Sequence, residues 1–180
     1  MKKISLLLLA LLGSAVLLSS CHKDSDRIYF QVGDQNFVND ASSSNSFEIQ
    51  AGKLAMTRGV SDSVKVFADS MINDNTKIAA KLSTVASQNG FMIPTTLQPV
   101  DQNNLNALNA LTGVAFDKQY AAIMVTAHDG VLTLFNNAAA ANGVGTPALR
   151  VFAGAQIPGL QTQLILSQRL VQAVSSESGQ

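Results

Sequence analysis

Hydrophobic residues recur at alternating intervals of four and three along most of the chain, which is the spacing that places them on one face of an α-helix. The cleanest run lies between Ser61, a predicted N-cap, and Gly90, a predicted C-terminal stop. Its inner face is predicted to carry Val64, Ala68, Met71, Asn75, Ile78, Leu82 and Val85. Asn75 is the polar exception on this hydrophobic face.

The same spacing predicts a long helix before this run and a short helix after it. The earlier helix extends from Asp34, its predicted N-cap, to about Arg58. A loop within residues 42–46 is the alternative, because serine and asparagine side chains compete for backbone hydrogen bonds. Residues 91–100 contain two prolines and predict a crossover loop, after which Asp101 is expected to cap a short helix.

Two more long helices are predicted in the last third of the chain. One begins at Asp117, as its N-cap, and places His128 on an otherwise hydrophobic face. The other begins at Thr146-Pro147, because proline is favoured at the first helical position. Pro158 lies inside this last helix and is expected to kink it or divide it in two.

Four long helices, one short helix and no repeated strand pattern predict an all-α fold. The long crossover before the short helix is the connection found in ferritin-like four-helix bundles. We therefore expect a ferritin-like bundle over residues 34–174, followed by a disordered tail over residues 175–180.

The N-terminus carries a separate signal. Lys2 and Lys3 precede a hydrophobic stretch that is too short for a typical membrane span and ends in Leu18-Ser19-Ser20-Cys21. This end resembles the lipobox of bacterial lipoproteins, in which the cysteine receives fatty acyl groups such as palmitate and becomes the first mature residue. The resemblance implies a signal peptide over residues 1–20, lipidation at Cys21 and a tether over residues 21–33. An uncleaved signal anchor is the alternative.

Composition narrows the possible partners. Removing residues 1–20 also removes Lys2 and Lys3, so ten of the 12 basic residues remain against 12 acidic ones, a formal charge of −2. This charge excludes a basic surface that holds nucleic acid by electrostatics alone. Cys21 is the only cysteine, so a lipidated Cys21 leaves no thiol for a disulfide, metal binding or nucleophilic catalysis.

Several segments together resemble a known family of bacterial envelope proteins. The segments are Glu48-Ile49-Gln50-Ala51-Gly52-Lys53-Leu54-Ala55, Phe67-Ala68-Asp69-Ser70-Met71-Ile72-Asn73-Asp74, Gly113-Val114-Ala115-Phe116-Asp117-Lys118-Gln119-Tyr120, Met124-Val125 with His128, Phe152-Ala153 and Ile157-Pro158-Gly159-Leu160. In this order they resemble the domain of unknown function 4142 family, whose members are often described as outer membrane proteins. The resemblance covers about residues 34–173 and implies a ferritin-like bundle. The function of that family is unknown.

The chain departs from the family pattern at two histidines. Family members commonly have Asp-His-Thr where this chain has Asp74-Asn75-Thr76, and a histidine where it has Gln163. Of the three family histidines, His128 alone is present. If the family binds a metal through these histidines, the resemblance makes this chain a poor candidate.

One polar residue on each long helix forms the candidate site. We expect Glu48, Asn75, His128 and Gln163 to meet as a buried polar layer that satisfies its own hydrogen bonds and fixes the helix register. A carboxylate beside an imidazole can also bind a metal or move a proton. Ferritin-like diiron sites use Glu-x-x-His pairs, and this chain has two glutamates and no such pair. A single weak metal at Glu48, His128 and Asp74 is the remaining metal hypothesis.

The expected function follows from these features. We expect an exported protein that is lipid-anchored in the bacterial envelope, at the periplasmic or the surface face of the outer membrane, with a non-enzymatic binding or structural role. No catalytic residue, cofactor or nucleic-acid partner is expected, and the sequence does not identify protein partners. The alternative is a degenerate ferritin-like metal-binding or redox protein, and a small-ligand carrier is also open.

Overall fold

The protein is described from a computed structural model that covers residues 33–177. These residues form five helices and no strand: α1 (Asp34–Arg58), α2 (Asp62–Gln88), α3 (Pro99–Asn109), α4 (Gly113–Ala139) and α5 (Pro147–Glu177). The predicted all-α class, with four long helices and one short one, is confirmed. Cys21 and nearly all of the expected tether lie outside the described residues.

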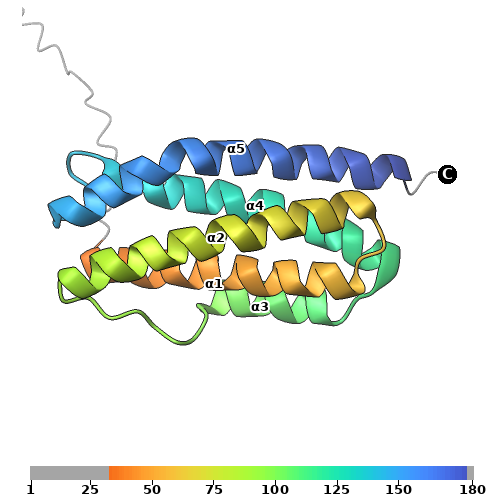
Figure 1. Cartoon of the computed structure of the whole chain (residues 1–180), viewed down its shortest axis with the longest axis horizontal. Coiled ribbons are helices and arrows are strands. Elements are labelled where there is room, and N and C mark those ends of the chain that lie inside the picture. The colour runs from red at the N-terminus through yellow and green to blue at the C-terminus, as the bar shows by residue number, and fades with distance from the viewer. Residues whose placement is uncertain (1–32, 178–180) are drawn as a thin grey trace, which may run out of the picture.

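The helices pack as two antiparallel pairs. α1 packs most extensively against α2, and α4 packs most extensively against α5. Figure 1 shows the long loop after α2 leading back to α3, which lies along α1 and precedes α4. No helix within residues 33–177 has both the length and the hydrophobicity required to cross a membrane.

The serine-rich part of α1 is helical, so the alternative loop at residues 42–46 is wrong. Ser43 is buried, and its hydroxyl donates to the carboxylate of Asp101 on α3 while accepting the backbone N–H of Gln98. These partners lie outside α1, so the side chain does not compete with the hydrogen bonds of its own helix.

Three aspartates that the sequence predicts as N-caps do not cap their own helices. The helices instead begin after Gly33, Gln98 and Thr112. Asp34 lies in the first turn of α1 and accepts the N–H groups of Gly145 and Thr146 at the start of α5. Because a carboxylate can satisfy the free N–H groups of any helix start within reach, its position in the sequence does not reveal which helix it serves.

Asp117 plays the same role at the opposite end of the bundle. Its carboxylate lies in α4 and accepts the N–H groups of Val60 and Ser61, at 3.1 and 2.8 Å, where α1 turns into α2. Gly59 leaves room for this contact, because a Cβ there would lie 2.7 Å from an oxygen of Asp117. The predicted cap at Ser61 is confirmed, since its hydroxyl accepts the N–H of Val64.

α5 is one helix with Pro158 inside it, so of the two expected outcomes, a kink or a division, the division is wrong. Pro158 has no N–H to donate to the carbonyl of Gly154, but the hydrogen bonds of neighbouring residues hold the helix together. Figure 1 shows the first part of α5, in lighter blue, inclined to the remainder, so the helix bends in its first half. α5 also continues to Glu177, three residues beyond the expected end of the bundle.

Candidate functional site

A polar layer divides the hydrophobic core of the bundle. One apolar cluster contains Phe47, Phe67, Met71, Phe116 and Tyr120, and the other contains Phe37, Leu82, Phe135, Leu149 and Phe152. On α2, α4 and α5, a buried polar residue lies between the positions that belong to the two clusters, and on α1 the buried polar residue directly follows Phe47 of the first cluster. These residues are Glu48, Asn75, His128 and Gln163, with 1%, 2%, 0% and 4% of their surface exposed.

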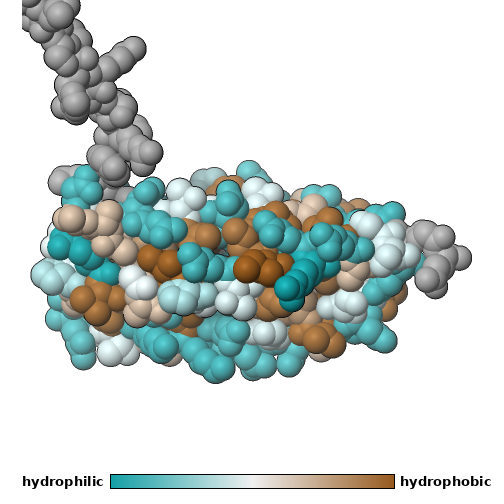
Figure 2. All heavy atoms as spheres, turned by 90° about the horizontal axis from the view of Figure 1, so that it is seen from above, coloured by the Kyte–Doolittle hydropathy of each residue, from teal (hydrophilic) through white to brown (hydrophobic). Residues whose placement is uncertain are grey.

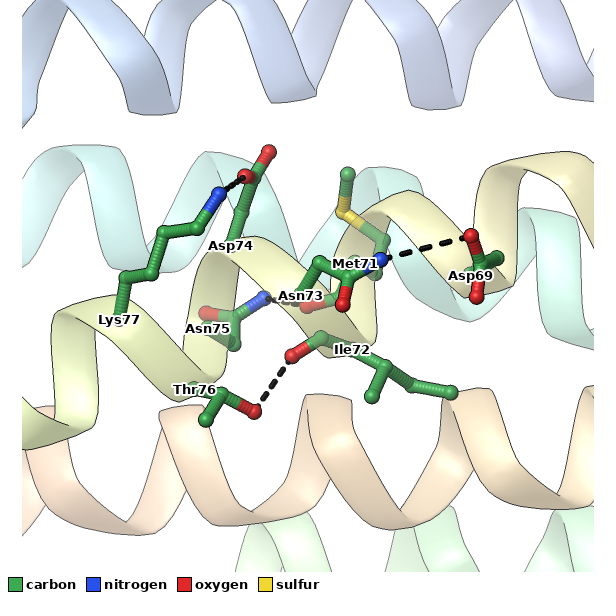
Figure 3. Close-up of polar contacts among 8 residues, drawn as sticks. All are labelled: Asp69, Met71, Ile72, Asn73, Asp74, Asn75, Thr76 and Lys77. Carbon is green, nitrogen blue, oxygen red and sulfur yellow. Dashed lines mark hydrogen bonds and ion pairs between the residues drawn. The ribbon is translucent and has the colours of Figure 1, made fainter.

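Three of these residues form one connected network. The side-chain amide of Asn75 donates to Oε2 of Glu48 at 2.5 Å, and Nε2 of His128 lies 3.4 Å from the same oxygen. The second hydrogen on the Asn75 amide goes to the carbonyl of Met71 at 3.0 Å, within α2 (Figure 3). The network therefore joins α1, α2 and α4 through a single carboxylate oxygen.

The orientation of His128 is set by its own helix. Its Nδ1 lies 2.7 Å from the carbonyl of Met124, one turn earlier in α4, so Nδ1 carries a hydrogen. This leaves Nε2 facing Glu48, in ion-pair range but without the alignment of a hydrogen bond. Burial lowers the pKa of His128, but the charge of Glu48, its contact and the Met124 carbonyl together raise the pKa above its ordinary value.

The raised pKa of His128 predicts how stability depends on pH. The folded protein binds this proton more tightly than the unfolded chain does, so the stabilisation is complete below about pH 6.5 and is lost as pH rises through the raised pKa. We expect the free energy of unfolding to fall there by at most about 1.4 kcal/mol per pH unit.

Urea titrations at pH values on both sides of 6.5 measure this slope. The matched control is His128→Gln, which removes the titrating group and should flatten the slope. Burial also raises the pKa values of Asp40 and Asp101, but both proteins contain these two carboxyl groups, so the comparison cancels their contribution. Equal slopes in the two proteins would contradict the prediction.

Tyr120 is a polar neighbour that the sequence pattern did not reveal. Its ring stacks on Phe116 and meets Phe67 edge-on, and its buried hydroxyl has no hydrogen-bond partner. Burial and then the negative charge of Glu48 raise the pKa of Tyr120, so the hydroxyl stays neutral. Tyr120 lies eight residues before His128, a spacing that places both on the same face of α4, so the sequence could have predicted that the two are neighbours.

Gln163 is buried at the level of the layer but makes no hydrogen bond with the other three residues. Its amide oxygen is buried and has no partner. It lines a surface groove between α2 and α5, which the network residues do not line. Of the four predicted layer residues, the structure therefore brings three into contact and leaves Gln163 beside them.

Asp74 is not part of this network. Its carboxylate pairs with Lys77 at 3.4 Å, and the side chain is 45% exposed (Figure 3). Of the three residues in the metal hypothesis, the structure brings together Glu48 and His128, and no group of three potential ligands occurs within residues 33–177. The other glutamate, Glu177, is exposed near the end of α5, so these residues do not fit a ferritin-like diiron centre.

Comparison with known proteins identifies a family for this chain. A family model described as a domain of unknown function (DUF4142) matches residues 24–170. No curated protein and no solved structure matches the chain.

Proposed function

The chain belongs to the DUF4142 family, and from this premise we propose that it is a ferritin-like, lipid-anchored helical bundle of the bacterial cell envelope with a non-enzymatic role in binding or support. The observation that carries the non-enzymatic part is the closed state of its buried network. Glu48, Asn75 and His128 are at most 2% exposed: Asn75 donates to Glu48 and to the Met71 carbonyl, Nδ1 of His128 donates to the Met124 carbonyl, and Nε2 of His128 faces Glu48. A general acid or base must come within hydrogen-bond reach of a substrate, which this packing prevents.

The network has a structural use within this proposal. Glu48 accepts from Asn75 on α2 and pairs with His128 on α4, so sliding any one of the three helices by a turn separates these groups. A buried group without its partner is unfavourable, so the network favours one register over its neighbours. The bundle then presents a constant surface, which suits binding or support.

The anchoring part of the proposal rests on the sequence before the described residues. Leu18-Ser19-Ser20-Cys21 closes a basic and hydrophobic leader, and two or more acyl chains anchor a protein stably where one chain is marginal. The chain enters α1 at Gly33, so twelve residues after Cys21 separate the proposed lipid from the bundle. We place the protein at the outer membrane, on its periplasmic or surface face.

Replacing Cys21 with alanine tests the anchor. We expect the variant to leave the membrane fraction or to accumulate with its leader uncleaved, because the acylated residue is lost. Fractionation of cells followed by mass spectrometry of the N-terminus measures both outcomes, with Ser25→Ala as the matched control in the tether. A Cys21→Ala protein that is cleaved normally and still sediments with membranes would disprove the proposal.

A mononuclear metal site is the second candidate function, and one observation favours it. The Met124 carbonyl fixes His128 with Nε2 free of any hydrogen bond and 3.4 Å from Oε2 of Glu48, a separation that two ligands of one metal can have. Metal analysis of the full chain purified from metal-replete medium distinguishes the candidates. Stoichiometric zinc, iron or manganese that is lost in His128→Ala would replace the first proposal with this one.

A further inference from the structure

A groove of about 330 Å³ lies between α2 and α5. Lys77 and Lys81 line it from α2, one helical turn apart, and Gly159, Thr162 and Gln163 line it from α5. Gly159 follows Pro158, and no atom lies within 4 Å of the place where a side chain at Gly159 would begin. The groove is therefore deepened by a missing side chain directly after the proline inside α5.

Gln163 forms the inner wall of this groove and lacks hydrogen-bond partners. Only 4% of the residue is exposed, and its amide oxygen has no partner. A buried polar group in this state is unfavourable, and native proteins usually supply it with a protein group, a water molecule or a ligand. The amide nitrogen also has no hydrogen-bond partner, and unlike the oxygen it is not fully buried, so it can donate to a molecule in the groove.

The charges around the groove favour a negatively charged occupant. Lys77 forms an ion pair with Asp74, which is the acidic residue among those that line the groove. Lys81 is exposed and has no ion pair with any carboxylate in the described part of the chain. Figure 3 shows Lys77 and Asp74 extending from the same side of α2, and Figure 2 shows polar residues interrupting the hydrophobic patches on the α5 side of the molecule. The lining of the groove thus carries two lysines against one aspartate.

We propose that this groove binds a small soluble oxyanion, with carboxylate or phosphate oxygens. Lys81 pairs with the anion, Lys77 adds a second positive charge, and the amide of Gln163 donates to an oxygen of the ligand. The space beside Gly159 receives the body of the ligand. This site goes beyond the proposed function, because it does not depend on lipidation at Cys21 and uses none of the three network residues.

Titration of the full chain in detergent tests the site, with inorganic phosphate and succinate as two separate probes. Sodium chloride keeps the ionic strength constant, which removes general screening effects. We expect saturable shifts of the side-chain NH₂ signals of Gln163 in nitrogen-15 NMR spectra, with a Kd of about 1 mM or tighter for at least one probe. The tighter probe identifies the class of oxyanion. Absence of saturable shifts with both probes would overturn the proposal.

Matched variants separate this site from general attraction to lysines. We expect Lys81→Gln to weaken binding about tenfold, whereas Lys53→Gln, an exposed lysine of α1, leaves it unchanged. Gly159→Ala should also weaken binding, whereas Gly130→Ala on α4 should not. Neither added methyl group meets an atom within 4 Å, so both glycine variants should fold. Equal binding in all four variants, or equal weakening by Lys53→Gln, would overturn the assignment.

Discussion

Replacing Glu48 with alanine is expected to lower the free energy of unfolding by about 3 to 5 kcal/mol, because it leaves a buried group without its charge partner. Glu48 joins three helices through one oxygen, which accepts from Asn75 and faces His128. After the substitution, the Asn75 amide keeps its bond to Met71 alone, and Nε2 of His128 faces a void. Urea unfolding followed by circular dichroism measures the change.

A double substitution distinguishes the cost of leaving one buried group unpaired from the contribution of the Glu48–His128 pair to the free energy of unfolding. Glu48→Leu with His128→Leu replaces a buried ion pair by hydrophobic groups, which is often neutral or stabilising by about 1 to 4 kcal/mol. We therefore expect the double variant to be more stable than Glu48→Ala. Glu177→Ala serves as the control, since this exposed glutamate should contribute less than about 0.5 kcal/mol. A Glu48→Ala protein as stable as Glu177→Ala would disprove the role of the network.

Leu82→Ala is expected to lower the free energy of unfolding by about 2 to 5 kcal/mol, because it removes a buried side chain and leaves a cavity. Leu82 is 1% exposed and belongs to the apolar cluster that also contains Phe37 and Phe135. The same urea titration measures the loss. Val66→Ala is the matched control on α2, since Val66 is 73% exposed and should change stability by less than about 0.5 kcal/mol. Equal effects of the two substitutions would contradict the assigned core.

The buried residues of a helix could be predicted where hydrophobic residues repeat along one of its faces. On α2, the spacing of hydrophobic residues identifies Val64, Ala68, Met71 and Leu82, all of which are buried. The same pattern does not show where Asp34 and Asp117 form their hydrogen bonds, because their partners are N–H groups of helix starts that are distant in sequence. Helical periodicity predicts which residues face inward. It does not predict which inward-facing groups from different helices contact one another.

For the polar site too, the sequence shows which residues face inward but not which of them meet. Asn75 and His128 stand out in sequence because each interrupts a hydrophobic face, and the structure places both against Glu48. Gln163 also lies at the inner surface, but whether its side chain reaches the other three residues depends on the packing of α5 against α2, which periodicity does not describe. Tyr120 was not identified because an aromatic ring in a hydrophobic stripe gives no sign that its hydroxyl will be buried without a partner.

The hydrogen bonds of Asp34 have a mechanical consequence. Any force applied along the chain from its N-terminal side enters the bundle at Gly33, beside Asp34. Because Asp34 is bonded to Gly145 and to both the N–H and the hydroxyl of Thr146, that force passes directly to the junction of α4 and α5. The load therefore reaches α4 and α5 as well as α1. A pull on the N-terminal side of the bundle must therefore break these three hydrogen bonds before the start of α1 can separate from the start of α5.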